Sequence, residues 1–209
     1  MHKVTARQKP GRLRIIGGEW RGRKLDVPSV PGLRPTADRI RETLFNWLRE
    51  QTPGARCLDL FAGSGALGLE ALSRGATHCH FVDRSKVATE AIKHHLETLG
   101  GGARGRVCCG DALQWQGPPA DLVFLDPPFA DDLLDPAIQH LEVAGLLSHG
   151  ARIYIELERR QALPELAASM EVLRDKTAGE VRYLLIGYQN QGLSGTNAAC
   201  TFSASREEN

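Results

Sequence analysis

Apolar and polar residues alternate in blocks along most of the chain, with short apolar runs followed by amphipathic stretches. The runs are four to six residues long and are bounded by glycine or polar residues, which is typical of buried strands. We therefore expect strands at residues 57–61, 78–82, 106–109, 122–125 and 152–157. Between them, apolar residues three or four apart predict helices at residues 64–74, 85–99, 132–141 and 163–170.

An earlier helix is expected from Thr36, a favoured N-cap residue, to Glu50. Arg39 and Arg41 are expected to lie off its apolar face. That face is formed by Ile40, Leu44, Trp47 and Leu48.

Single residues mark the ends of the helix expected at residues 85–99, where Ser85 is placed to cap it and Gly100 to end it. Two final β-rich runs, at residues 171–176 and 181–188, are joined by Ala178-Gly179, which predicts an antiparallel hairpin. Strand–helix alternation of this kind predicts an α/β fold, in which helices cover both faces of a mostly parallel sheet with an antiparallel finish at one edge.

The N-terminal region differs from this body. Residues 12–25 read as a β-hairpin with Gly17-Gly18 as its turn, and prolines make the following stretch an extended connector. Residues 1–50 carry 12 Lys and Arg against 5 Asp and Glu, a surplus of +7, whereas the rest of the chain has a net charge of −6. This asymmetry indicates either a contact for a polyanion or a solubilising basic arm. We expect a hairpin and connector at residues 1–35, a main domain at 36–188 and a mobile tail without function at 189–209.

Composition excludes several classes of protein. With 42% hydrophobic and 24% charged residues the chain is not globally disordered, and no apolar run is long enough to cross a membrane. The basic N-terminus lacks the apolar region of a signal peptide. Five cysteines without C-x-x-C spacing indicate a soluble protein of a reducing compartment, and His78 and His80 alone predict no metal site.

A glycine-rich segment follows the first strand of the main domain. Gly63, Gly65 and Gly68 spell G-x-G-x-x-G, and Asp83 follows 20 residues after Gly63, placed to bind a ribose hydroxyl pair. The pattern predicts a nucleoside-bearing cofactor at the carboxyl ends of the strands, and both NAD and S-adenosylmethionine fit it.

Two further acidic residues narrow the choice of cofactor. Asp59 ends the first strand, where a carboxylate suits the sulfonium and ammonium of S-adenosylmethionine better than a pyrophosphate. Asp111 follows the third strand and is placed either to bind an adenine amino group or to cap a turn, two interpretations that stay open.

The segment Asp126-Pro127-Pro128-Phe129 directly follows an apolar strand. Two prolines remove two N–H donors, so backbone carbonyls and the Asp126 carboxylate remain as acceptors beside an aromatic ring. Such acceptors suit the exocyclic amino group of a planar base, whose lone pair they direct at an electrophilic methyl group, while the Phe129 ring holds the flipped base.

These motifs resemble a known family. The Asp-Pro-Pro-Phe segment is similar to the (Asn/Asp)-Pro-Pro-(Tyr/Phe) motif of amino-group methyltransferases. Together with residues 14–25, 33–46 and 59–75 it resembles the bacterial RsmD family, 16S rRNA guanine-N2 methyltransferases that use S-adenosylmethionine. The resemblance extends over residues 12–188. It implies a Rossmann-like class I methyltransferase fold, a seven-stranded mostly parallel sheet with an antiparallel last strand, plus the N-terminal hairpin.

The resemblance also implies the site. The target guanine is held by Asp126, Pro127, Pro128 and Phe129. The cofactor is held by Asp59, Phe61, Ala62, Gly63, Ser64, Gly65, Asp83, Arg84, Asp111 and Ala112. RNA is contacted by Arg12, Arg14, Arg21, Arg23, Lys24, Arg34 and Arg39.

The implied enzyme is cytoplasmic and monomeric, and acts on 16S rRNA within an assembled or partly assembled small ribosomal subunit. Three alternatives stay open. An adenine-N6 methyltransferase of DNA or RNA shares the chemistry, an NAD-dependent oxidoreductase shares the glycine loop, and a non-catalytic RNA-binding factor shares the basic arm.

Glu156 and Glu158 are interpreted as residues of a solvated strand end.

Overall fold

The computed structural model describes residues 11–28 and 37–190. The predictions for Arg34, Thr36 and residues 191–209 lie outside these residues. The division of the chain at residues 36 and 189 stays a prediction.

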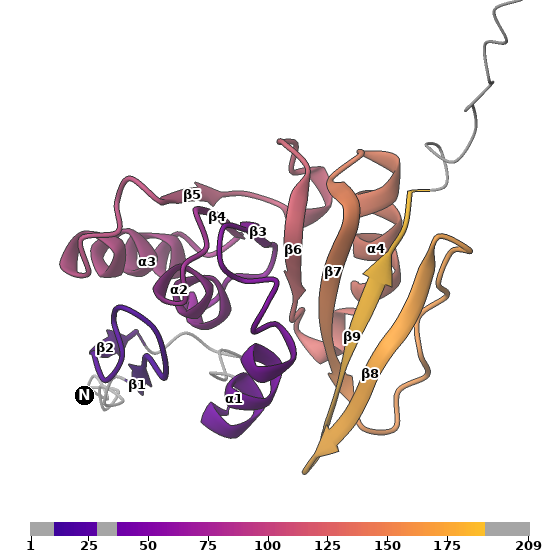
Figure 1. Cartoon of the computed structure of the whole chain (residues 1–209), viewed down its shortest axis with the longest axis horizontal. Helices are drawn as coiled ribbons and strands as arrows, with labels where there is room; N and C mark the ends of the chain where they lie inside the picture. The colour runs from indigo at the N-terminus through magenta and orange to yellow at the C-terminus, as the bar shows by residue number, and fades with distance from the viewer. Residues whose placement is uncertain (1–10, 29–36, 191–209) are drawn as a thin grey trace, which may run out of the picture.

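A seven-stranded sheet forms the centre of the molecule, in the order β5-β4-β3-β6-β7-β9-β8 (Figure 1). Five neighbouring strands are parallel, namely β5 (Gly105–Cys109), β4 (His78–Asp83), β3 (Arg56–Asp59), β6 (Ala120–Leu125) and β7 (Leu147–Glu158). The last strand, β9 (Val181–Tyr188), runs antiparallel between β7 and β8 (Met170–Ala178). The predicted sheet, including its antiparallel last strand, is confirmed.

Helices cover both faces of the sheet, and each face has its own hydrophobic cluster. One face packs against α1 (Asp38–Trp47), α2 (Ala66–Ser73) and α3 (Lys86–Thr98). The other packs against α4 (Leu134–Val143). Short 3-10 helices, η1 (Ala112–Gln114) and η2 (Phe129–Asp131), follow β5 and β6.

Local chemistry sets the ends of α3 as predicted. The Ser85 hydroxyl accepts a hydrogen bond from the Ala88 N–H at 3.3 Å, which satisfies one of the donors that the first turn of a helix leaves unpaired. Gly100 follows the C-cap with φ of +70°, a left-handed conformation that favours glycine.

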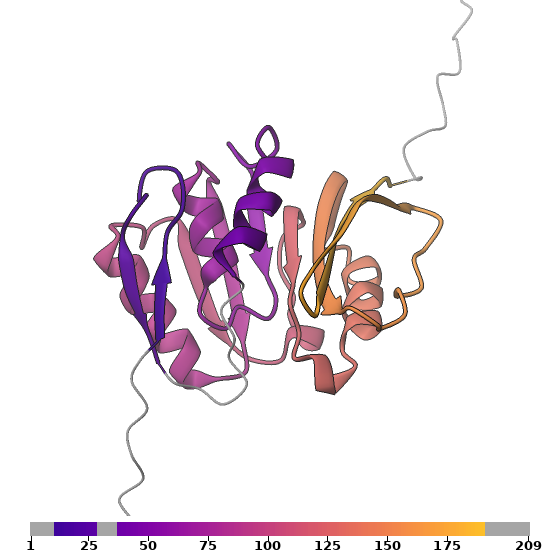
Figure 2. The same ribbon diagram turned by 90° about the horizontal axis from the view of Figure 1, so that it is seen from below.

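The N-terminal hairpin consists of β1 (Gly11–Arg14) and β2 (Lys24–Val27), which pair in register from Gly11↔Val27 to Arg14↔Lys24 (Figure 2). The prediction that Gly17-Gly18 forms its tight turn is wrong, because the turns lie at residues 18–21 and 20–23. The glycine pair instead packs against the C-terminal end of α2, where a Cβ at Gly18 would collide with the Ser73 carbonyl.

The prediction of a helix at residues 163–170 is also wrong, because α4 holds this segment in an irregular conformation. The Glu165 N–H donates to the Asp135 carboxylate at 3.0 Å, and the Ser169 hydroxyl donates to Glu142 at 2.7 Å. Pro164 has no N–H to give to a helix. The Leu- and Ala-rich composition that favours a helix is therefore overridden by tertiary contacts.

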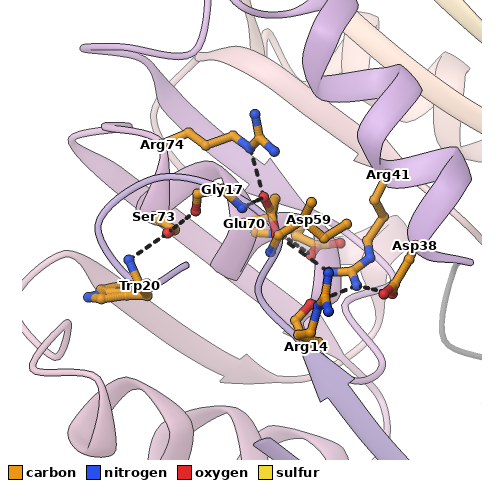
Figure 3. A network of polar contacts seen from close by, with 11 residues as sticks. Arg14, Gly17, Trp20, Asp38, Arg41, Asp59, Glu70, Ser73 and Arg74 are labelled. Carbon is orange, nitrogen blue, oxygen red and sulfur yellow. Dashed lines mark hydrogen bonds and ion pairs between the residues drawn. The ribbon is translucent and has the colours of Figure 1, made fainter. Parts of the chain in front are cut away.

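Helix α1 begins at Asp38 and ends at Trp47, short of the predicted Glu50. Its apolar face is buried as expected, but Arg41, predicted to lie off that face, is 0% exposed. The Arg41 guanidinium donates to the Asp38 carboxylate at 2.7 Å and to the Arg14 carbonyl at 2.8 Å. It also lies 3.5 Å from a Glu70 carboxylate oxygen on α2 (Figure 3). Burial of this cation therefore depends on a partner 29 residues away in the sequence.

Glu70 joins the hairpin to the main body. Its carboxylate accepts the N–H groups of Ile16 and Gly17, both at 2.8 Å, and pairs with Arg74 at 2.7 Å. Ser73, one turn later on α2, accepts the Trp20 N–H at 2.9 Å and donates to the Gly17 carbonyl. The hairpin and α2 also share one hydrophobic cluster.

Within the described part of the chain, no helix has the length and apolar character needed to cross a bilayer.

Candidate active site

A cavity of about 650 Å³ opens at the carboxyl ends of the parallel strands. Its walls come from the segments that follow β3, β4, β5 and β6, the place where open α/β sheets bind ligands. A cavity of this size lies within the range that accommodates a cofactor-sized molecule.

The glycine loop after β3 forms one wall. Gly63 has φ of +50° and donates its N–H to the Asp83 carboxylate at 2.7 Å, and Asp83 also accepts the Ser85 N–H at 2.7 Å. Asp83 therefore fixes the loop to the end of β4 while lining the cavity. Gly68 has a packing role, because a Cβ there would collide with Phe81 on β4.

Asp59 lines the same cavity at the end of β3 but is only 2% exposed. Its carboxylate accepts the Gly68 N–H at 3.0 Å. Burial, and then the nearby charge of Asp83, raise the pKa of Asp59 to about 7, although the Gly68 hydrogen bond opposes this shift. No basic side chain of the described residues forms an ion pair with it. A buried carboxylate of this kind suits a ligand that carries a positive charge.

Arg84 and Asp111, which follow β4 and β5, also line the cavity. The Asp111 carboxylate caps η1 by accepting the Leu113 N–H at 2.9 Å, and it also lines the cavity, so the two alternatives for this residue are compatible. Arg84 forms an exposed ion pair at 2.8 Å with Asp131, which lies in η2 just after the Asp-Pro-Pro-Phe segment. This pair therefore joins the two sides of the cavity mouth.

The Asp-Pro-Pro-Phe segment forms the remaining wall. All four of its residues line the cavity; Pro127 is buried, and Phe129 is 37% exposed. The structure thus brings the two principal motifs of the sequence to one cavity. Of the predicted cofactor residues only Gly65 is absent from the wall, since it acts as the left-handed N-cap of α2.

Sequence reasoning missed Glu156. The interpretation of this residue as part of a solvated strand end is wrong: Glu156 is 4% exposed, and it accepts a 2.8 Å hydrogen bond from the hydroxyl of the buried Tyr154. Glu156 lies inside β7 between the apolar residues Ile155 and Leu157, and the sequence alone does not mark it as buried. Glu158, by contrast, is exposed.

The predicted RNA contacts among the described residues are all exposed: Arg12, Arg14, Arg21, Arg23, Lys24 and Arg39. None of them lines the cavity. The tip of the hairpin packs at the C-terminal ends of α2 and α3, where Arg23 donates to the Thr98 carbonyl at 3.1 Å. These helix ends lie where the parallel strands begin, whereas the cavity lies at the carboxyl ends of the strands.

His78 and His80 lie two residues apart on β4, with ring centroids 4.7 Å apart. Among the described residues, no group of three or more histidine, cysteine or acidic side chains is arranged to hold a metal ion.

Comparison with known proteins places this geometry in context. The model of the family described as conserved hypothetical protein 95 matches residues 13–187. The chain is 48% identical over 187 residues to ribosomal RNA small subunit methyltransferase D of Escherichia coli strain K12, covering 88% of this chain and 94% of that protein. It is 42% identical over 198 residues to the protein of the same name from Haemophilus influenzae, covering 91% and 100%. The solved structure of Escherichia coli yhhF superposes with a TM-score of 0.80 at 44% identity, covering 87% of this chain and all of that one.

Proposed function

Because the chain belongs to the family described as conserved hypothetical protein 95, together with the small subunit rRNA methyltransferases D, we propose that it methylates the N2 amino group of one guanine in 16S rRNA. The observation that carries this proposal is the single cavity shared by the glycine loop and the Asp-Pro-Pro-Phe segment. One motif provides a nucleoside-binding wall and the other an acceptor for an amino group, so a cofactor and a base can meet there.

The proposed cofactor is S-adenosylmethionine, which supplies a methyl group on a positively charged sulfur. Asp59 provides a buried negative charge for its cationic part, and Asp83 and Asp111 provide acceptors for its ribose and adenine. The backbone of Phe61, Ala62, Gly63 and Ser64 allows close approach along one wall, and Arg84 and Ala112 complete the opposite side. An NAD-dependent oxidoreductase would leave the Asp-Pro-Pro-Phe segment without a role.

Asp126 is the proposed catalytic residue, with its two prolines and Phe129 around it. The amino nitrogen of a base is a poor nucleophile because its lone pair is delocalised into the ring. The Asp126 carboxylate and the neighbouring carbonyls would accept the amino protons, so that the lone pair points at the methyl carbon. The nitrogen forms one bond to carbon, the carbon–sulfur bond breaks, and one proton passes to solvent. Phe129 supports the base after it leaves its stack.

The substrate is proposed to be the rRNA of an assembled or partly assembled small ribosomal subunit, and the protein a cytoplasmic monomer. The exposed arginines and Lys24 of the hairpin, with Arg34 and Arg39, are proposed to contact its phosphates. The names of the relatives from Escherichia coli and Haemophilus influenzae support small-subunit rRNA as the substrate.

The experiment that tests the function is transfer of labelled methyl from S-adenosylmethionine to small subunits from cells that lack this protein, followed by nucleoside mass spectrometry. Label in N2-methylguanine is the expected result. Label in N6-methyladenine would favour the adenine alternative, and absence of both transfer and cofactor binding would overturn the assignment of the glycine loop.

The role of Asp126 is tested by Asp126→Ala. Loss of the acceptor is expected to lower kcat by about 10²–10³-fold while cofactor affinity stays near the wild-type value. Asp121→Ala is the matched control, because Asp121 lies near the other end of the same strand and pairs with Arg56. Near-normal turnover of Asp126→Ala would contradict the assigned role. Absence of turnover in the wild type, together with RNA binding that Asp126→Ala leaves unchanged, would favour a non-catalytic RNA-binding protein.

A further inference from the structure

Acidic residues dominate the wall of the cavity, although the proposed substrate is a polyanion. Five aspartates line it: Asp59, Asp83, Asp111, Asp126 and Asp131. Among the described residues of the wall, Arg84 is the one with a basic side chain. Carboxylates repel an RNA phosphate, so Arg84 is the charge of this wall that attracts the backbone of an approaching nucleotide.

Arg84 is held at the mouth of the cavity by Asp131. Its guanidinium donates to the Asp131 carboxylate at 2.8 Å, and the two side chains are 72% and 35% exposed. Asp131 is in turn fixed to the Asp-Pro-Pro-Phe segment, because its N–H donates to the Pro128 carbonyl at 3.1 Å. The ion pair therefore connects the end of β4, next to the proposed ribose acceptor Asp83, with the segment proposed to hold the base.

This ion pair leaves most of the guanidinium unused. An arginine carries several N–H donors in a planar fork, and within the described part of the chain a single one of those of Arg84 has an acceptor. The fork suits the two oxygens of a phosphate better than it suits one carboxylate oxygen. An ion pair as exposed as this one stabilises little, so a phosphate that accepts two charge-assisted hydrogen bonds can displace Asp131 readily.

We propose that Arg84 binds a backbone phosphate beside the target guanine, and that Asp131 holds the same guanidinium at the mouth until the RNA arrives. In the free protein the Asp131 carboxylate takes the place of the phosphate, and the exchange of one anion for the other opens the mouth to the base. This role of Arg84 toward the nucleotide adds to its place in the proposed cofactor wall. The proposal rests on the proposed function, since it takes RNA as the substrate.

An alternative role for the ion pair is to brace the Asp-Pro-Pro-Phe segment. The two roles predict effects of different sign. If the pair is a brace, Arg84→Gln and Asp131→Asn both loosen the segment and impair the enzyme alike. If the pair is exchanged, Arg84→Gln removes a phosphate ligand, whereas Asp131→Asn frees that ligand and removes a like charge from the path of the RNA.

The test measures affinity for small ribosomal subunits from cells that lack this protein, at several salt concentrations, together with methyl transfer at saturating cofactor. Arg84→Gln is expected to weaken binding about tenfold and to reduce the slope of log affinity against log salt by about 1, with the loss in KM for the subunit rather than in kcat. Asp131→Asn is expected to strengthen binding about two- to fivefold. Most of this gain should disappear in the double variant, which has no guanidinium to free.

Arg56 and Asp121 provide a matched control pair. They form a partly exposed ion pair at 3.1 Å, and they lie near the amino ends of β3 and β6, away from the cavity. Arg56→Gln and Asp121→Asn are expected to keep the wild-type affinity and salt slope. A wild-type salt slope in Arg84→Gln, or similar losses in Arg84→Gln and Asp131→Asn, would overturn the proposal. A wild-type protein that does not bind small subunits would instead refute the proposed function, and this proposal with it.

Discussion

Asp59 is an acidic residue that the fold makes difficult to ionise. Its pKa of about 7 lies well above the value of about 4 for an aspartate in an unfolded chain. Between these two values the folded protein binds a proton that the unfolded chain has lost, so the free energy of unfolding falls as the pH rises through this window. A bound cation would oppose this loss of unfolding free energy, because it favours the ionised form of the Asp59 carboxylate.

Cofactor binding is therefore expected to depend on pH. If only ionised Asp59 binds the cation, the affinity for S-adenosylmethionine should rise about tenfold between pH 6 and 8. Isothermal titration calorimetry across this range measures the effect.

Asp59→Asn supplies the comparison. This variant should bind the cofactor more weakly at pH 8, with a flatter pH profile, and without cofactor it should be the more stable protein above pH 7. Equal pH profiles in variant and wild type would show that Asp59 does not bear the charge that the ligand meets.

At the scale of helices and strands, the contact between α1, α2 and the hairpin depends on one carboxylate. Glu70 is completely buried and receives two backbone N–H groups of the hairpin as well as the guanidinium groups of Arg41 and Arg74. Removing the Glu70 charge takes one carboxylate partner from the completely buried Arg41, which keeps the more exposed Asp38 carboxylate, and such a loss costs more than an exposed ion pair is worth.

Glu70→Gln is expected to lower the free energy of unfolding by about 3–5 kcal/mol, measured by urea denaturation. The matched control is Glu90→Gln on α3, whose ion pair with Lys93 is exposed and whose loss should be almost silent. A cost for Glu70→Gln as small as that of the control would mean that the hairpin is held by apolar packing alone.

The helices and strands that the sequence predicted are those governed by local chemistry or by strong hydrophobic periodicity. Ser85 caps its helix within three residues, and each buried strand of the parallel sheet carries its own apolar run. The residues that were wrongly interpreted depend on distant partners. Arg41 is buried because Glu70 lies on another helix, and residues 163–170 are irregular because α4 offers acceptors to their backbone and side chains.

The same distinction applies to the site. The glycine loop and the Asp-Pro-Pro-Phe segment are local motifs, and their convergence on one cavity follows from the parallel order of the strands. The burial of Glu156 depends on the distant Asp-Pro-Pro-Phe segment, whose prolines line the same small hollow. No periodicity in the sequence contains that information.

At the scale of the whole molecule, the tip of the basic hairpin lies away from the cavity. The hairpin tip reaches the C-terminal end of α3, whereas the cavity lies near its N-terminal end. A helix of 13 residues spans about 20 Å, so an RNA that contacts both is bound over much more than the target nucleotide. This separation favours a large, structured substrate over a short single strand.

Replacing Arg12, Arg14, Arg21 and Arg23 together by glutamine is expected to weaken RNA binding and to reduce the slope of log affinity against log salt by up to about 4. Filter binding at several salt concentrations measures both quantities. Cofactor affinity should not change, because these residues lie outside the cavity wall. An unchanged salt slope would assign the RNA contact to another surface.

The burial of Leu13, Ile15, Trp20, Leu25 and Val27 against α2 and its neighbours has a consequence for chimeric enzymes. A hairpin grafted from a relative onto this body would arrive with its own apolar underside and its own backbone donors. It would dock only if the host kept a carboxylate at position 70, a hydroxyl at position 73 and room beside Gly18. The hairpin is therefore exchangeable only together with the residues of α2 that it contacts. Two lineages that changed either the hairpin or these α2 residues would have had to change both.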